Sequence, residues 1–468
     1  MAPYRPAPIS QPAPGRFTQL VEAAKRGRLV LYLGAGISMA EPSCGPSGWD
    51  VANVLRPNVA QMLGVDEGDL AGLSLEELAQ RVAEEDDERL ETLRVRASEA
   101  ADFLGITPNF GHEAVALLLR EGVIKLISVN WDRGVEIAGL RVDVGIQGVA
   151  SPQESIEIGH GLTVFKVHGC ATRPPTLAIT QREIDEPQGW AVGQVQGALA
   201  DGIVAFVGLG TVGLYVREPI EDLVEAWGKE ASSVLVADPV LSAAWEEALG
   251  GPEEAAKSHI ESDADGFLDD LLRGLVLEAL VMSEQQIRIL PQEEGWVATM
   301  LKGFLELRKA LGQANADGVI RWWRDGVSTG ADGTPFITEQ GGEWSMMTVG
   351  FLAGEDGGEI EVSGSRGRQT VASGERYFEI VSRPAQPISE VERVGRHRIQ
   401  QRYADGVYGD KKPVSAVVAG AIGRFPSEEA PTDISAGSTE MTDVAEGIEA
   451  IPIRFFAAED GVRGRLAV

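Results

Sequence analysis

The sequence predicts an α/β fold with a doubly wound, mostly parallel sheet. Short apolar segments of strand composition recur along the first half of the chain, and helical patterns lie between several of them. Strands that alternate with helices form parallel sheets, because each helix returns the chain to the same end of the sheet. The composition and the spacing of apolar residues change after about residue 285, which predicts a second, smaller part of the structure.

Composition narrows the class of protein. The chain has 468 residues, 44 % of them hydrophobic and 24 % charged, so it can bury a sizeable core. A net charge of −30 disfavours a general binder of nucleic-acid backbones. The only cysteines, Cys44 and Cys170, exclude a disulfide framework and a four-cysteine zinc ribbon. No segment is apolar over the ~20 residues that span a membrane, and no secretory signal is evident, so we expect a cytoplasmic protein.

The elements follow in order. Residues 1–15 are rich in proline and predict a disordered tail. A helix is expected from Ser74, because Ser74 and Glu77 form a capping box, and the acidic residues 84–88 are expected to continue it. A second helix is expected over 108–120. Strands are predicted at residues 28–33, 123–129, 163–168, 203–208 and 233–237.

The second part of the chain contains two regions of different composition. Residues 286–330 carry apolar side chains at helical spacing and predict a helical connector. Residues 331–468 are rich in Gly, Thr, Ser and Val in short stretches, which predicts a β-rich C-terminal domain with long loops.

A glycine motif follows the first predicted strand. The strand runs into Gly34-Ala35-Gly36 and then into an expected helix. Glycines at such a turn let the backbone approach a diphosphate, and the helix N-terminus supplies N–H donors. The third glycine of the dinucleotide-binding fingerprint is absent, since Met39 stands there, and no P-loop lysine follows. A tight turn on a buried strand remains an equal interpretation.

Polar residues end two further predicted strands. Asn130 and Asp132 follow the strand at 123–129, and they either cap the helix expected at 133–138 or point toward a bound sugar. His168 is followed by Gly169 and is either a general base or a hydrogen-bonded structural histidine. The remaining histidines are interpreted as structural: His112, His160, His259 and His397.

The last two strands end in a similar way. Gly208, Gly210 and Thr211 suit a second close approach of backbone to ligand, and Asp238 either meets a ribose hydroxyl or starts a turn. The polar residues of all these segments stand at the carboxyl ends of predicted parallel strands. In open α/β sheets this edge binds the ligand, so the sequence predicts one shared site.

The order of these motifs resembles the sirtuin family. Gly34-Ala35-Gly36-Ile37-Ser38 comes first, then Asn130-x-Asp132, then His168-Gly169, and then Gly208-x-Gly210-Thr211. The resemblance covers about residues 16–250. It implies a Rossmann-like, sirtuin-like NAD-binding catalytic domain over residues 16–285.

Three departures refine this resemblance. The four cysteines of the deacylase zinc ribbon do not follow His168-Gly169, and the phenylalanine-glycine-glutamate stretch that pairs with a peptide is missing. Residues 177–180 and the loop 44–50, with Trp49, look instead like the bacterial sirtuin-like NAD-cleaving effectors of anti-phage defence. That branch is therefore the nearest family.

The resemblance implies an NAD hydrolase that releases nicotinamide and ADP-ribose and defends bacteria by depleting NAD, without a metal. Asn130, Asp132 and His168 would be catalytic. The residues implied in NAD binding are Gly34, Ala35, Gly36, Ile37, Ser38, Trp49, Gly208, Gly210, Thr211 and Asp238. Two alternatives remain: a non-catalytic scaffold that binds NAD or ADP-ribose, and a zinc-free protein deacylase or ADP-ribosyltransferase.

Such an enzyme needs control, because free NAD hydrolysis kills the host. We expect homo-oligomerisation or a protein partner, such as a motor ATPase or an Argonaute-like protein, to supply it. The domain at 331–468 is the candidate for this regulatory or assembly role. We expect no membrane contact, and the acidity of the chain disfavours direct nucleic-acid binding.

Overall fold

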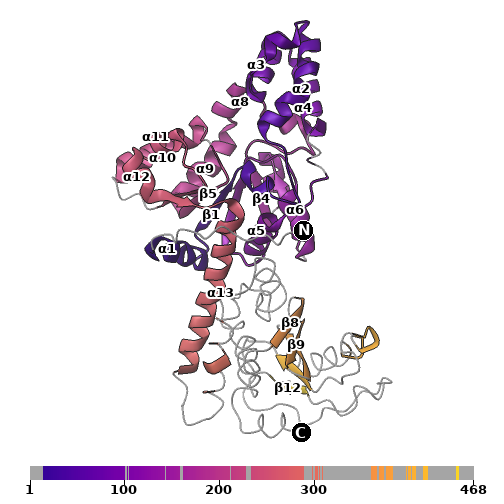
Figure 1. The fold of residues 1–468 in the computed structure, drawn as a ribbon, viewed down its shortest axis with the longest axis vertical. Coiled ribbons are helices and arrows are strands. Elements are labelled where there is room, and N and C mark those ends of the chain that lie inside the picture. The colour runs from indigo at the N-terminus through magenta and orange to yellow at the C-terminus, as the bar shows by residue number, and fades with distance from the viewer. Residues whose placement is uncertain are drawn as a thin grey trace. The chain divides into compact units, whose positions relative to one another are not determined.

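The computed structural model describes residues 14–100, 103, 105–142, 144–158, 162–210, 212–227 and 233–288, and shorter segments between 298 and 452. The chain divides into two compact units, Met1–Leu271 and Leu272–Val468 (Figure 1). The predicted tail at 1–15, except its last two residues, and most of the predicted connector at 286–330 lie outside the described residues. Within the described part of the chain, no helix is long and apolar enough to cross a membrane.

A seven-stranded, all-parallel sheet forms the centre of the first unit, which confirms the predicted Rossmann-like α/β fold. Its order is β3-β4-β2-β1-β5-β6-β7. The strands are β1 Leu29–Leu33, β2 Ile124–Ser128, β3 Ile146–Val149, β4 Leu162–Lys166, β5 Ile203–Val207, β6 Val234–Asp238 and β7 His259–Glu261. From β1 the chain crosses to β2 on one side, and from β5 it crosses to β6 on the other. The boundary between β1 and β5 is therefore the topological switch point, where such sheets bind ligands.

Helices cover the sheet on both sides. Figure 1 shows α10, α11 and α12 beside the β5–β6 half and α5 and α6 beside the β4 half. The helices are α1 Pro14–Lys25, α5 Phe110–Arg120, α6 Gly134–Arg141, α7 Pro152–Ile158, α9 Gly189–Asp201, α10 Leu214–Trp227, α11 Ala243–Ala248, α12 Pro252–Ser258 and α13 Ala264–Arg288, with the 3₁₀ helices η1 Ala35–Ser38, η2 Glu67–Leu70 and η3 Pro174–Thr176. The core between sheet and helices is centred on Tyr32, Phe206 and Trp245, which are all buried.

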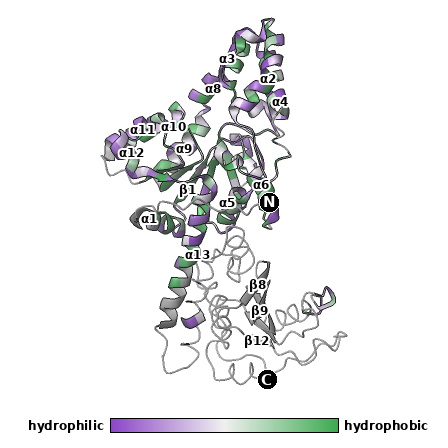
Figure 2. Cartoon of the chain, viewed as in Figure 1, coloured by the Kyte–Doolittle hydropathy of each residue, from purple (hydrophilic) through white to green (hydrophobic). Residues whose placement is uncertain are grey.

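A group of helices forms a cap at one end of the sheet (Figure 1). It comprises α2 Gly48–Leu63, α3 Leu75–Glu85, α4 Asp87–Ala100 and the short α8 Gln181–Asp185. The cap has its own apolar cluster, which includes Leu55, Leu78 and Leu93. Figure 2 shows the hydrophilic residues that alternate with hydrophobic ones along these helices. The amphipathic pattern explains how the cap buries one face and exposes the other.

The start of α3 was predicted, but its end was not. Ser74 and Glu77 form the expected capping box. The prediction that residues 84–88 continue the helix holds only for residues 84 and 85, because Asp86 is extended, with φ −166° and ψ 118°. The Asp86 carboxylate accepts the N–H of Glu88 at 2.8 Å, so Asp86 starts α4 instead. Aspartate favours such local bonds over the helix interior.

In the second unit, the described residues include a five-stranded sheet. Its order is β12-β11-β10-β9-β8, with β8, β9 and β10 antiparallel and β10, β11 and β12 parallel. The strands are β8 Ile360–Ser365, β9 Arg368–Ser373, β10 Arg376–Ser382, β11 Ser415–Ala419 and β12 Ala450–Pro452. All five strands fall within the region predicted to be β-rich.

Candidate functional site

A cavity of about 760 Å³ lies between the carboxyl ends of the central strands and the helical cap. This volume is in the range of small-molecule sites, ~300–1,000 Å³. Seven of the predicted site residues line it together: Ala35, Ser38, Asn130, Asp132, His168, Gly208 and Gly210. Gly34, Gly36 and Ile37 belong to the same turn behind the lining, and Thr211 lies outside the described residues.

The two glycine motifs pack directly against each other. The N–H of Gly34 donates to Val207 O at 3.0 Å, and the N–H of Gly36 donates to Gly208 O at 2.9 Å. A Cβ on Gly34 would lie 2.4 Å from Gly208 O, and one on Gly36 would lie 2.7 Å from Gly208 Cα. These glycines are therefore required for contact between turns. Gly210 differs, because a Cβ there would meet nothing within 4 Å.

The helix expected after Gly36 is only the single 3₁₀ turn η1, and α2 begins later, at Gly48. The turn therefore has a smaller dipole than a full helix N-terminus. Ala35 is its exposed residue, and its N–H has no acceptor among the described residues. This N–H is the donor that the turn can offer to a ligand.

A buried hydrogen-bond chain runs behind the cavity. The N–H of Asn109 donates to His112 Nδ1 at 3.3 Å, so the neutral ring carries its proton on Nε2. His112 Nε2 lies 3.2 Å from Ser38 Oγ, and Ser38 Oγ donates to Asp132 Oδ2 at 2.8 Å. Burial lowers the pKa of His112 to about 4 against the opposing effect of Asp132, so the ring is neutral at pH 7. The chain ties the first glycine turn to the loop after β2.

Asp132 is an anchor of that loop. Its Oδ1 accepts the N–H of Gly134, the first residue of α6, at 2.7 Å, and its Oδ2 is bonded to Ser38. Its carbonyl accepts a bond from Lys166 Nζ, which also lies 3.1 Å from Glu136. Burial acts to lower the pKa of Lys166, but Glu136 chiefly raises it, so the pair is charged. This arrangement favours the helix-cap interpretation of Asp132 over direct contact with a sugar.

Asn130 presents an unpaired acceptor. Its Nδ2 donates to Gly34 O at 3.0 Å and lies 3.4 Å from Ser38 Oγ. A carbonyl can only accept, so this contact fixes the orientation of the amide. Asn130 Oδ1 is buried and has no partner among the described residues. A buried acceptor without a partner costs ~1–3 kcal/mol, so a ligand donor here would recover that free energy.

His168 lines the same cavity, partly buried. Its Nε2 lies 2.9 Å from the Tyr215 hydroxyl. Burial lowers the pKa of His168 from 6.5 to about 4, so the ring is neutral at pH 7 and can accept a proton. Gly169 has φ +89°, and a Cβ there would lie 2.1 Å from Thr176 O. The His-Gly pair thus reflects a turn that only glycine permits.

The side chains that line the cavity are acidic. Glu76, Asp132 and Asp185 line it, and no Lys or Arg does so among the residues that the structure describes. A ligand with a cationic group suits this lining, and phosphates would be met by neutral donors. The described residues contain no group of three or more His, Cys, Asp or Glu side chains placed to hold a metal ion.

Two predicted residues lie away from the lining. Trp49 is half exposed and packs against Arg56, whose guanidinium carbon lies 5.7 Å from the ring centre. Asp238 Oδ1 accepts the N–H of Val240 at 3.1 Å, which is the turn-starting role left open by the sequence. Their part in NAD binding stays a prediction.

Sequence reasoning missed four side chains around the site. His112 was interpreted as structural and proves to bond Ser38. Tyr32 and Lys166 were assigned to predicted strands, and Tyr215 was given no role. A lysine inside an otherwise apolar strand was the one available signal, since it requires a buried acid partner.

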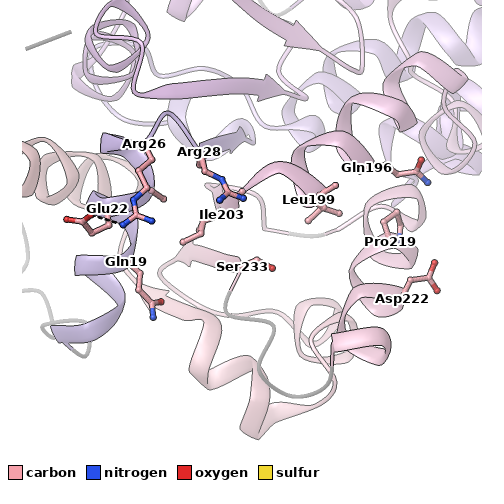
Figure 3. Close-up of a pocket in the computed structure, with 13 residues that line it drawn as sticks. Gln19, Glu22, Arg26, Arg28, Gln196, Leu199, Ile203, Pro219, Asp222 and Ser233 are labelled. Carbon is pink, nitrogen blue, oxygen red and sulfur yellow. Dashed lines mark ion pairs between the residues drawn. The ribbon is translucent and has the colours of Figure 1, made fainter. Parts of the chain in front are cut away.

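A second cavity, of about 710 Å³, lies at the amino ends of β1, β5 and β6, between α1, α9 and α10 (Figure 3). Its polar lining includes Arg26, Arg28, Gln196, Asp222 and Ser233. None of the predicted site residues contributes to it. It therefore serves as an internal comparison for the first cavity.

No protein family and no curated protein matches this sequence.

Proposed function

We propose that this protein is a sirtuin-like NAD hydrolase, which breaks the bond between nicotinamide and ribose and transfers ADP-ribose to water. One observation carries the proposal: the unpaired Asn130 Oδ1 and the neutral His168 line one cavity at the switch point of a Rossmann-like sheet. The order of the motifs that resembles the sirtuin family supports the choice of NAD. The acidic lining suits the cationic nicotinamide ring of NAD, whereas the two phosphates would have to be met by neutral backbone donors.

The chemistry needs few groups. The C–N bond to nicotinamide breaks, its electron pair goes to the ring, and the ribose carbon passes through an oxocarbenium-like state. Water then forms a C–O bond to that carbon and loses a proton. The net reaction converts NAD⁺ and water into nicotinamide, ADP-ribose and a proton.

The residues of the cavity fit these steps. Neutral His168 would accept the proton from water, a contribution of ~10²–10⁴-fold for a positioned general base. Asn130 Oδ1 would accept a hydrogen bond from a ribose hydroxyl or from the attacking water. Asp132 would act indirectly, by holding Ser38 and the loop that carries Asn130.

The dinucleotide needs neutral contacts for its diphosphate. The exposed N–H of Ala35 and the open turn at Gly210 would supply close backbone approach. Trp49, Thr211 and Asp238 remain further proposed contacts. We also propose that the enzyme is a defence effector, controlled by oligomerisation or by a protein partner through residues 331–468.

The test is an NAD-consumption assay on the purified full-length chain, with nicotinamide and ADP-ribose separated by chromatography. It is repeated with the product of the neighbouring gene, because a controlled enzyme can be silent alone. We expect Asn130→Ala and His168→Ala each to lower turnover by at least about 100-fold. Unchanged turnover in both variants would refute the assignment of the site.

The alternatives give different products. A scaffold would bind NAD and release no nicotinamide under any condition. A transferase or deacylase would release nicotinamide while ADP-ribose or an acyl group appears on another acceptor. Free ADP-ribose in equal amount to nicotinamide distinguishes the hydrolase from both.

A further inference from the structure

Two tyrosines form a chain of hydroxyls that ends on His168. Tyr32 lies in the central strand β1 and is 1 % exposed. Its hydroxyl oxygen is 2.6 Å from that of Tyr215, and the Tyr215 oxygen is 2.9 Å from His168 Nε2. All three residues line the cavity that holds Asn130. The proposed reaction assigns no role to either tyrosine.

The protonation states of the three groups are fixed at neutral pH. Burial raises the pKa of Tyr32 and of Tyr215 above the ordinary value of 10, so both phenols keep their protons. Burial lowers the pKa of His168 to about 4, so its ring holds one proton. Three protons must therefore be placed in this chain: one on each hydroxyl and one on either ring nitrogen.

Only one arrangement gives every hydroxyl proton an acceptor. If Tyr32 donates to Tyr215 and Tyr215 donates to His168 Nε2, both hydroxyl protons have an acceptor. The ring proton of His168 is then on Nδ1. If His168 Nε2 donates and the chain runs the other way, the proton of Tyr32 has no acceptor among the described residues. If both Tyr32 and His168 donate to Tyr215, the proton of Tyr215 has none. A buried donor without an acceptor is unfavourable, so the first arrangement is preferred.

We propose that Tyr32 and Tyr215 are positioning residues that hold His168 as the tautomer protonated at Nδ1, with the lone pair on Nε2. The catalytic consequence rests on the proposed function: the lone pair of Nε2 accepts the Tyr215 hydroxyl, so the Tyr215 proton would move to Nε2 while the Tyr215 oxygen takes the proton that water loses. The tautomer itself is a property of the free protein and can be measured without substrate.

The test is nitrogen NMR of the full-length chain labelled with ¹⁵N at histidine. The chain has five histidines, and His168→Gln identifies the signals of His168. We expect Nε2 to resonate as an unprotonated ring nitrogen and Nδ1 as a protonated one between pH 6 and 8. A protonated Nε2 in the wild type would overturn the proposal.

Two conservative variants measure how much each tyrosine contributes to the tautomer ratio of His168. Tyr215→Phe removes the donor to Nε2 and should lower the tautomer ratio by about 2–10-fold, the effect of one net hydrogen bond. Tyr32→Phe should cause a smaller shift in the same direction, because Tyr215 keeps its proton but loses the hydroxyl that polarises it. Tyr403→Phe, in the other unit, is the matched control and should leave the ratio unchanged. A ratio unaffected by Tyr215→Phe contradicts the proposal.

Turnover separates this inference from the function on which it rests. If the protein cleaves NAD, Tyr215→Phe should lower kcat by at least about 2–10-fold and leave KM nearly unchanged, because the hydroxyl that passes the proton to Nε2 is removed. A wild-type protein with the expected tautomer and no NAD cleavage, even with the product of the neighbouring gene present, would refute the function alone. Active protein with Nε2 protonated would refute the tyrosine chain alone.

Discussion

The two cavities of the first unit have similar volumes and different chemistry. The one at the carboxyl ends of the strands, about 760 Å³, holds the unpaired Asn130 Oδ1 and neutral His168. The one at the amino ends, about 710 Å³, is lined by exposed polar side chains such as Arg26, Gln196 and Asp222 (Figure 3). Buried polar groups fixed by their neighbours, and not volume, therefore distinguish a candidate site.

The largest effect is expected on NAD turnover, when a substitution in the lining of the first cavity is compared with one in the second. His168→Ala removes the proposed base and should lower NAD turnover by about 10²–10⁴-fold. Gln196→Ala changes the second cavity at an exposed position and should leave turnover within about twofold. Initial rates of nicotinamide release measure both variants. A loss of activity in Gln196→Ala that matches His168→Ala would remove the distinction between the cavities.

The next effect concerns the buried ion pair behind the Asn130 loop. Lys166→Met leaves Glu136 charged and unpaired, and should reduce the free energy of unfolding by about 3–5 kcal/mol. The double variant Lys166→Met, Glu136→Leu removes both charges and should recover part of that loss. Denaturant unfolding measures the difference. Equal stability of the single variant and the wild type would show that the pair does not hold the loop.

The two glycine turns give a matched pair of smaller effects. Gly34→Ala places a Cβ against Gly208 and should cost about 1–3 kcal/mol of stability. Gly210→Ala meets no atom within 4 Å, so it should leave stability within about 0.5 kcal/mol. Since Gly210 lines the cavity, its variant should instead weaken NAD binding. Thermal unfolding and titration calorimetry separate the two results.

A further effect is a pH dependence. The folded protein has a pKa of about 4 for His112 and for His168, below the ordinary value of 6.5. Between these values the unfolded chain binds more protons, so stability is fully present above pH 6.5 and falls as the pH drops toward 4. NAD turnover should also persist to about pH 5 and fall near pH 4. An activity midpoint near 6.5 would contradict a buried, neutral His168.

The sequence predicted the central strands well because each is a short apolar segment. It missed the edge strands β3 and β7, which are short and contain Gly148 or the polar His259 and Glu261. The end of α3 was also mispredicted, because an Asp86 cap and a helical acidic face look alike in sequence.

The position of the site could be predicted from the sequence, but the hydrogen bonds within it could not. Strand ends located Asn130 and His168, since strand direction alone brings them to one edge. The role of Asp132 depended on Ser38, which is 94 residues away, and that of Tyr32 on Tyr215, which is 183 residues away. Contacts of this range follow from the folded packing and leave no local pattern to interpret.

The place where NAD binds tests the proposed site most directly. Hydrogen–deuterium exchange of the full-length His168→Ala protein, with and without NAD, reports on the site while turnover is suppressed. We expect slower exchange in peptides covering residues 34–38, 128–132 and 208–216, and no change over 19–28 and 196–203. Protection confined to the second set, or no protection at saturating NAD, would contradict it.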